Sequence, residues 1–233
     1  MNLHIRRGVY AHMEAVLPKP HKDRPIEGRM AKWYASNTGK MMTQFVELAR
    51  RIAQQLPPNA QVLEIAPGPG YFAIELAKLG DFSITGVDLS QDLVNIAAAN
   101  ARQAGVRVEF KQGNASRLPV EDNSFDFLLC RAAFKNFGEP VKALQEMHRV
   151  LKPGGRAMII DLRKHAPLPE INRAVDEMHL DAWNRWITKL TFRFLLLRTA
   201  YSRPQFDHML AQSGFRGIDV KEEGIGFEIT LTK

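Results

Sequence analysis

The stretch Val62-Leu63-Glu64-Ile65-Ala66-Pro67-Gly68-Pro69-Gly70-Tyr71-Phe72 predicts a short buried strand, a tight glycine turn and the start of a helix. The apolar residues before the turn are typical of a strand that is covered on both faces. Gly68 and Gly70 allow the backbone to turn sharply and to approach a ligand closely, because they carry no Cβ. Since the first N–H groups of a helix have no partner within it, we expect a ligand at this junction.

The negative charge of Glu64 helps to decide whether that ligand is an anion or a cation. The residues from Gly68 to Ala73 fit the G-x-G-x-x-G/A fingerprint of dinucleotide sites, in which the start of the helix receives a pyrophosphate. A carboxylate beside the turn would oppose a bound anion and would favour a cation. The sequence therefore favours a cationic ligand, and a nicotinamide-dependent oxidoreductase stays as the alternative.

The pattern V-L-E-x-A-x-G-x-G resembles motif I of the class I S-adenosylmethionine (SAM) methyltransferases, whose ligand carries a sulfonium and an ammonium group. The resemblance implies that Glu64 serves the amino-acid end of SAM. It also assigns Ala66, Gly68 and Gly70 to the turn around the cofactor. The first glycine of the family is Ala66 here, and because alanine does not readily take a positive φ, the sequence predicts a slightly altered turn.

The segment from Phe82 to Asp88 is typical of a second strand, and it ends in an acid. A carboxylate at that place can accept hydrogen bonds from both ribose hydroxyls of a nucleoside. Ser90 is already placed to cap the following helix, which leaves Asp88 for the ribose. The cofactor site implied by the resemblance also includes Leu89.

The segment from Val106 to Phe110 alternates like a third strand. Gly113-Asn114-Ala115 and the later Leu118-Pro119 resemble the G-D-A…L-P segment of the same family. The resemblance implies that Asn114 meets the adenine amino group and that Ala115 lies beside it. An amide oxygen can accept that hydrogen bond, although without the help of a charge.

The run from Phe125 to Arg131 predicts a fourth strand and resembles the F-D-x-V motif of the family. In a doubly wound sheet, the carboxyl end of this strand lies next to the central strand, at the crevice where ligands bind. We therefore expect Arg131 near the carboxylate of SAM and the residues up to Asn136 near the methyl group or the acceptor. Phe134 and Lys135 are candidates for lining the acceptor site, and Lys135 is equally compatible with a solvated side chain.

The turn L-K-P-G-G, from Leu151 to Gly155, and the strand Ala157–Asp161 complete a series of family motifs that covers roughly residues 60–161 in the expected order. Two later segments, Phe215–Val220 and Ile225–Leu231, read as an antiparallel edge, with the last one beside the fifth strand. The fold class predicted is α/β: a doubly wound, seven-stranded, mostly parallel sheet of the Rossmann-like class I methyltransferase type.

A class I domain over residues 38–233 would carry a helical lid insertion at about 165–202, which is rich in aromatic and basic residues. His179 and Trp183 are candidates for lining the acceptor site from this lid. Aromatic residues at helical spacing more often belong to a core or a dimer contact than to a substrate site, and a helix on a membrane surface is a third interpretation.

Residues 1–37 are expected to help cover the active site. Tyr34 is the candidate for covering the methionine end of the cofactor, and simple packing is the alternative. The first 30 residues are basic and broken by prolines. A solvated segment is the favoured interpretation, ahead of an arm that touches an anionic substrate or a membrane.

Cys130 is the only cysteine among 233 residues, so the chain has neither an intramolecular disulfide nor a cysteine metal cluster. This usage suits a reducing compartment, and we expect a cytoplasmic protein. No signal peptide or run long enough to span a bilayer is evident. The net charge of +7 permits an anionic partner without requiring one.

Taken together, the sequence predicts a SAM-dependent methyltransferase that acts on a small organic or lipid-like acceptor, without a metal, as a monomer or homodimer. No residue stands out as a general base, so the catalytic residues stay unassigned. An RNA methyltransferase is the second alternative, favoured by the charge and opposed by the lack of an N-P-P-Y-like motif or an RNA-binding module. A peripheral contact with a membrane stays open.

Overall fold

The computed structural model describes residues 22–176, 186, 188, 189 and 197–233. The helices among them are α1 (Gly28–Thr38), η1 (Gly39–Met41), α2 (Met42–Ala53), α3 (Tyr71–Ala77), α4 (Gln91–Gln103), η2 (Phe134–Asn136), α5 (Pro140–Val150), α6 (Leu168–Asp176), α8 (Leu197–Thr199) and α9 (Arg203–Leu210). The strands are β1 (Gln61–Ile65), β2 (Ser83–Asp88), β3 (Glu109–Gln112), β4 (Phe125–Arg131), β5 (Leu151–Leu162), β6 (Gly217–Glu223) and β7 (Gly226–Thr232).

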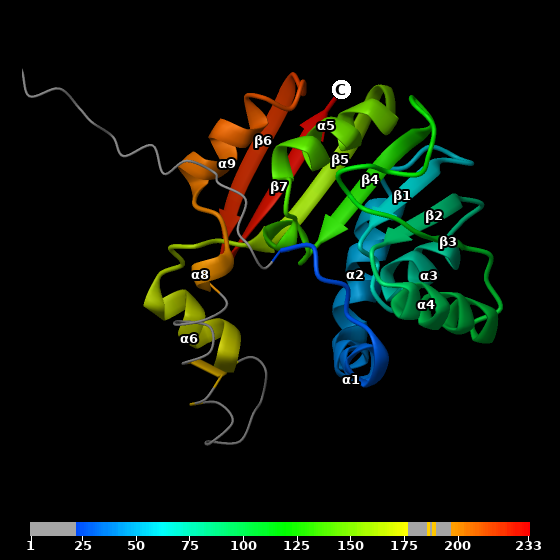
Figure 1. Cartoon of the computed structure of the whole chain (residues 1–233), viewed down its shortest axis with the longest axis horizontal. Helices are drawn as coiled ribbons and strands as arrows, with labels where there is room; N and C mark the ends of the chain where they lie inside the picture. The colour runs from blue at the N-terminus through cyan, green and yellow to red at the C-terminus, as the bar shows by residue number, and fades with distance from the viewer. Residues whose placement is uncertain (1–21, 177–185, 187, 190–196) are drawn as a thin grey trace, which may run out of the picture.

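Seven strands form one sheet in the order β3-β2-β1-β4-β5-β7-β6 (Figure 1). The first five strands run parallel, and β7 pairs antiparallel with both β5 and β6. The predicted doubly wound, mostly parallel sheet is therefore confirmed, including the insertion of the last strand beside the fifth. Because the strand order reverses between β1 and β4, a crevice is expected at the carboxyl ends of these two strands.

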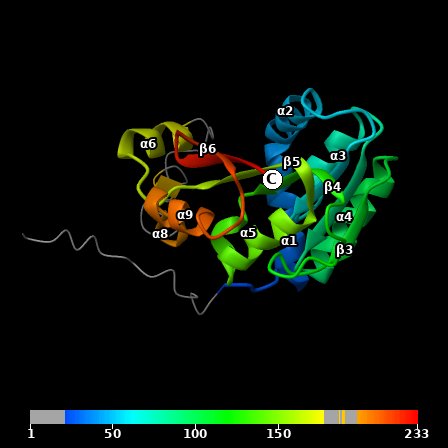
Figure 2. The same cartoon turned by 90° about the horizontal axis from the view of Figure 1, so that it is seen from above.

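Alternate residues of the central strands enter two separate cores, as a sheet covered on both faces requires. In β4, Phe127 and Leu129 pack with α2 and α3, whereas Leu128 and Cys130 pack with α5 and α9. Figure 2 shows these two pairs of helices on opposite sides of the sheet. Burial on both faces fixes the register of the strands, and with it the position of the residues that follow them.

The main differences from the sequence-based prediction lie in the third and fifth strands. Strand β3 begins at Glu109, where the chain first pairs with Thr85 of β2, so the residues from Val106 to Val108 are not in the strand. The stretch Leu151–Gly155, predicted as a turn, forms the first part of β5. Its pairing with β4 is irregular, because the register shifts between Phe125 and Phe127.

The insertion at about 165–202 is described in part. Helix α6 buries Ile171 and Val175, and Tyr201 after α8 is buried and bridged to Arg163. His179 and Trp183 lie outside the described residues. The boundaries of the predicted lid and of the N-terminal segment remain predictions.

Candidate functional site

A cleft opens at the carboxyl ends of β1, β2 and β4, with an empty volume of about 750 Å³ up to its mouth. From the first two strands, the predicted site residues that line it are Ala66, Gly68, Asp88 and Leu89. From α1 and from the segments around β3 and β4, they are Tyr34, Asn114, Ala115 and Arg131. Eight residues that are scattered along the sequence are thus brought to one site.

Asp88 ends β2 and is only 6% exposed. Its carboxylate accepts a hydrogen bond from the backbone N–H of Gly68 at 3.0 Å and another from the N–H of Ser90 at 2.9 Å. Burial raises the pKa of Asp88, and the two N–H donors act in the opposite direction. Each carboxylate oxygen has further acceptor capacity, so Asp88 can still receive hydroxyl groups from a ligand.

Glu64 lies on β1, one residue before the strand ends, and is 4% exposed. Its carboxylate accepts a hydrogen bond from the backbone N–H of Ala73, in the first turn of α3, but its Oε2 atom has no partner. Burial raises the pKa of Glu64 to about 8, and the negative charge of Asp88 adds a smaller increase. The hydrogen bond from Ala73 and the positive charge of Arg131 lower the pKa. A buried carboxylate oxygen without a donor is costly, so Glu64 would gain from a cation or donor placed beside it.

Tyr34 approaches the glycine turn from α1. A Cβ added to Gly68 would lie 3.3 Å from the ring atom Cε1 of Tyr34, and Gly68 has a φ of +56°. Only glycine combines this backbone conformation with such an approach at low strain. Burial raises the pKa of the Tyr34 hydroxyl. The ring therefore lies against the glycine turn, and its role over the methionine end of the cofactor stays a prediction.

Ala66 corrects one expectation about the turn. Its φ is +54°, so the residue adopts the left-handed conformation that the sequence analysis expected alanine to avoid. The N–H of Ala66 donates to the carbonyl of Val87 at 2.8 Å, which ties the turn to the end of β2. The turn thus keeps a left-handed geometry at a strain of roughly 1–2 kcal/mol.

Arg131 is the positively charged side chain among the predicted site residues that line the cleft. Its guanidinium donates to Oε1 of Gln44 at 3.0 Å and lies 4.7 Å above the ring of Phe45. Burial lowers the pKa of Arg131, and the nearby Glu64 raises it. Both contacts are with α2, so they hold the side chain beside the end of β4.

Asn114 lines the cleft, and its Oδ1 atom accepts a hydrogen bond from the N–H of Ser116 at 2.8 Å. The bond fixes the side chain in a turn after β3. A carbonyl oxygen has two lone pairs, so the amide can accept one more donor from a ligand.

Glu64 and Gly70 are not on the surface of the cleft, although both were predicted for the cofactor site. Glu64 is not among the residues that line it, whereas Ile65, the next residue of β1, is. Gly70 starts α3, and a Cβ there would come within 2.7 Å of the Phe110 ring and 3.0 Å of the Cβ of Ala97. Gly70 therefore serves the packing of α3 against its neighbours.

Phe134 and Lys135 also lie away from the cleft. Phe134 is fully buried in an aromatic cluster with Phe137, Tyr201 and Phe206. Lys135 Nζ pairs with Oδ1 of Asp161 at 3.0 Å, with side chains that are 11% and 1% exposed. The short helix η2 turns both side chains inward, so their neighbours Ala133 and Asn136 line the cleft instead.

The four residues Asp23–Ile26, which no motif in the sequence marks, form part of the wall of the cleft. The carbonyl of Ile26 accepts a hydrogen bond from the Ser90 hydroxyl at 2.6 Å. The backbone N–H of Asp23 donates to the carbonyl of Asn136. This part of the N-terminal segment is thus packed on the domain. The predicted capping role of Ser90 is confirmed, since its hydroxyl accepts from the N–H of Leu93.

Among the described residues, no group of three or more histidine, cysteine, aspartate or glutamate side chains is arranged to hold a metal ion. Within the same part of the chain, no helix is long and apolar enough to cross a membrane.

Comparison with known proteins points in one direction. A family model described as a methyltransferase domain matches residues 56–196. A ubiquinone/menaquinone biosynthesis C-methyltransferase of Bdellovibrio bacteriovorus is 39% identical over 102 residues, which are 43% of this chain and 43% of the relative. A demethylmenaquinone methyltransferase of Chlorobaculum parvum is 30% identical over 167 residues, which are 67% of this chain and 66% of the relative. The chain therefore spans less than half the length of the first relative.

Among solved structures, a protein of Methanococcus maripaludis proposed to be an S-adenosyl-L-methionine-dependent methyltransferase has a TM-score of 0.72. It is 23% identical in sequence, and the alignment covers 90% of this chain and 94% of the other. At this identity the likeness concerns the fold, and it agrees with the strand order found here.

Proposed function

The chain belongs to the methyltransferase-domain family, and on this premise we propose that it is a SAM-dependent methyltransferase with a small organic or lipid-like acceptor. The match covers more than half of the chain and includes the glycine turn, Asp88 and Arg131. A nicotinamide-dependent oxidoreductase is disfavoured by the same membership.

The observation that carries the proposal is the unpartnered Oε2 atom of Glu64. A buried carboxylate beside the glycine turn suits a cationic ligand and disfavours the pyrophosphate of a dinucleotide. SAM carries an ammonium group that would supply the missing donor. The side chains present at the turn therefore fit the cofactor that the family implies.

Other residues on the cleft fit the nucleoside part. Asp88 has acceptor capacity left for two ribose hydroxyls, and its carboxylate is already fixed by the N–H groups of Gly68 and Ser90. Asn114 has one lone pair left for the adenine amino group. We assign Leu89 and Ala115, which flank these two side chains, to the walls around the nucleoside.

SAM supplies an electrophilic methyl group on a sulfonium when it is bound. The work of the chain is then to hold the acceptor aligned with that carbon and to exclude water. Tyr34 and the Asp23–Ile26 segment would close the cleft on one side. We assign no general base, since one is needed only if the acceptor must lose a proton.

The acceptor class rests on two kinds of support. The two relatives are named for quinone methylation, which favours a lipid-like aromatic acceptor. The lining of the cleft also has an apolar part, which includes Pro25, Ile26 and Phe137. We propose that the acceptor enters there and that the N-terminal segment and the insertion at about 165–202 cover it.

Incubation with methyl-labelled SAM and separate acceptors tests the proposal. The acceptors are a reduced prenylated naphthoquinone, a reduced prenylated benzoquinone and total RNA, and the products are identified by mass spectrometry. We expect label in a lipid-soluble product, and clearly less of it with Asp88→Ala at the same enzyme concentration and a limiting concentration of SAM. Label in RNA alone would contradict the acceptor class. Binding of NAD rather than S-adenosylhomocysteine in calorimetric titrations would overturn the methyltransferase assignment.

A further inference from the structure

The two faces of α1 differ in character. Ala31 and Ala35 are buried, and Tyr34 on the same side reaches the glycine turn. The opposite side exposes large apolar side chains: Trp33 is 62% exposed and Met30 is 58% exposed. Met41, at the end of η1, which follows α1 directly, is 39% exposed. We call this side, with Met30, Trp33, Met41 and the three bases named next, the outer face of α1.

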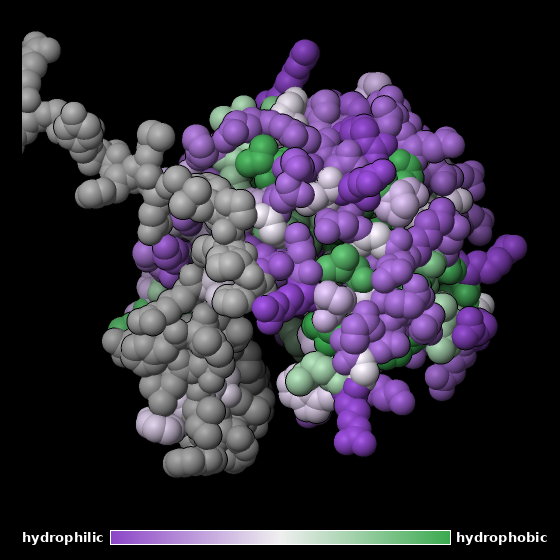
Figure 3. All heavy atoms as spheres, in the orientation of Figure 1, coloured by the Kyte–Doolittle hydropathy of each residue, from purple (hydrophilic) through white to green (hydrophobic). Residues whose placement is uncertain are grey.

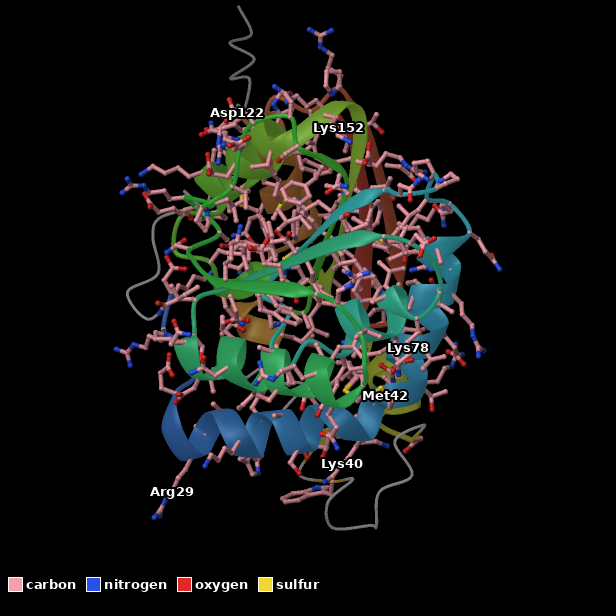
Figure 4. All side chains as sticks on the ribbon, turned by 90° about the vertical axis from the view of Figure 1, so that its right-hand side faces the viewer. Arg29, Lys40, Met42, Lys78, Asp122 and Lys152 are labelled. Atoms are coloured by element: carbon pink, nitrogen blue, oxygen red, sulfur yellow. The ribbon has the colours of Figure 1, made fainter. Side chains whose placement is uncertain are left out.

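The bases of the outer face are Arg29, Lys32 and Lys40, and all three side chains are exposed. Residues 28–46 contain no aspartate or glutamate. Figure 4 shows Arg29 and Lys40 on the side of α1 and η1 that points away from the sheet. In Figure 3, the surface at the lower end of the molecule mixes apolar and strongly polar residues.

Two acids at the start of α1 and of α4, Glu27 and Asp92, are engaged with backbone N–H groups. The Glu27 carboxylate accepts hydrogen bonds from the N–H groups of Gln91 and Asp92, and the Asp92 carboxylate accepts one from the N–H of Gly28. Both acids thus join α1 to the start of α4 and do not neutralise the outer face. The positive charge beside Trp33 is left facing solvent.

We propose that the outer face of α1 docks on a membrane surface that contains anionic phospholipids. Single exposed apolar residues are ordinary on proteins, but here a tryptophan and two methionines lie together beside three bases. An interfacial helix uses this combination, with the indole at the headgroup level and the bases on the lipid phosphates. The charge complements an anionic surface, since each nearby base adds to the attraction.

A second copy of the chain fits this face less well. A symmetric dimer through the outer face would bring its three bases against the same three bases of the partner, with no acid from residues 28–46 to pair them. RNA would satisfy the bases but would leave Met30 and Met41 exposed at the contact. The membrane is therefore the occupant that satisfies both kinds of side chain.

The position of α1 gives the docking a consequence for the cleft. Tyr34 covers the glycine turn from the buried side of the helix whose other side would rest on lipid. The segment Asp23–Ile26, which lines the cleft, leads directly into the same helix. This consequence rests on the proposed function, whereas the docking itself does not.

Vesicle flotation with the full chain tests the proposal. The vesicles consist of phosphatidylcholine alone or with about 30% phosphatidylglycerol, because the proposal requires the anionic lipid. One variant carries Arg29→Glu, Lys32→Glu and Lys40→Glu. The matched control carries Arg107→Glu, Lys142→Glu and Lys221→Glu, three exposed bases elsewhere. Each replacement changes the charge by two, so both variants fall from +7 to +1.

We expect the wild type to float with the anionic vesicles only. The outer-face variant should bind at least about tenfold more weakly and the control within about twofold of the wild type. Trp33→Ala, which keeps every charge, should also weaken binding severalfold. Each variant is first titrated with S-adenosylhomocysteine, and unchanged affinity shows that its fold and cleft are intact.

Three outcomes would overturn the proposal. Equal losses in the two charge variants would mean that general basicity drives binding. Undiminished binding of the outer-face variant would place the lipid contact elsewhere in the chain. Self-association or RNA binding that the outer-face variant abolishes, without any flotation of the wild type, would assign the face to a second copy or to RNA. Failure of the methyl-transfer assay would not affect the flotation result.

Discussion

The Asp88 carboxylate accepts a hydrogen bond from the backbone N–H of Gly68 at 3.0 Å, although the two residues are 20 positions apart. The bond joins the end of β2 to the glycine turn after β1, and it fixes one oxygen of the carboxylate at the edge of the cleft. The acid and the turn are thus a single unit, so a change in either should be felt at the cofactor site.

The first prediction concerns this unit. Asp88→Ala should lower the affinity for S-adenosylhomocysteine by at least about tenfold, because it removes charge-assisted acceptors for the ribose. Isothermal titration calorimetry measures the change. Asp81→Ala, which removes an exposed acid ahead of β2, is the control and should bind normally. Wild-type affinity in Asp88→Ala would show that the ribose assignment is wrong.

Glu64→Gln should stabilise the unliganded protein more at about pH 8 than at about pH 5. Burial raises the pKa of Glu64 from 4.5 to about 8, so in this range the folded chain holds a proton that the unfolded chain has released. The contribution of Glu64 to stability is therefore complete below about pH 4.5 and is lost as the pH rises through about 8. Glutamine does not titrate and keeps an acceptor for the N–H of Ala73.

The measurement is the free energy of unfolding from urea titrations at both pH values. The advantage of the variant should grow by at most about 1.4 kcal/mol per pH unit within the range. Gln55→Ala is the control, because it replaces an exposed residue just after α2 that does not titrate. Its effect on the free energy of unfolding should not depend on pH. An advantage that does not vary with pH would mean that Glu64 is ionised throughout.

Ala66→Gly should raise the free energy of unfolding by roughly 0.5–1 kcal/mol, because it relieves the left-handed conformation at φ +54°. Ala99→Gly, at an exposed position inside α4, should lower it by about 1 kcal/mol, as glycine does within helices. Thermal or urea unfolding measures both changes in the free energy of unfolding, which should have opposite signs. Destabilisation by both replacements would indicate that Ala66 is not strained.

Lys135→Met should destabilise the protein by about 3 kcal/mol, because it leaves the carboxylate of Asp161 buried without its cation. Lys142→Met, which breaks an exposed pair with Glu139, should change stability by less than about 1 kcal/mol. The same variants are assayed for the KM of the acceptor. A raised KM with normal stability for Lys135→Met would restore Lys135 to the acceptor site.

Much of the fold could be predicted because the sheet is held by local patterns in a fixed order. The motifs from β1 to β5 placed five parallel strands, and Ser90 marked the start of α4 correctly. The limits of β3 were missed because alternation alone does not show where pairing begins, and Glu109 is the first residue with a partner on β2.

The site was predictable where a residue is the last one of a strand. Asp88 and Arg131 reach the cleft because their strands end there. The prediction failed for Phe134 and Lys135, which lie a few residues beyond the end of β4 in the short helix η2. Their side chains point away from the cleft, and no motif in the sequence indicates the orientation of η2. The Asp23–Ile26 wall depends on contacts such as that of Ile26 with Ser90, 64 residues away, which no local pattern reveals.

The most direct test is the crystal structure of the chain with S-adenosylhomocysteine. The account predicts density in the cleft at the ends of β1, β2 and β4, with the ribose hydroxyls on the Asp88 carboxylate and the amino group on the side of Glu64. An empty cleft in crystals that contain the compound at saturating concentration, or a nucleoside bound away from Asp88, would contradict it.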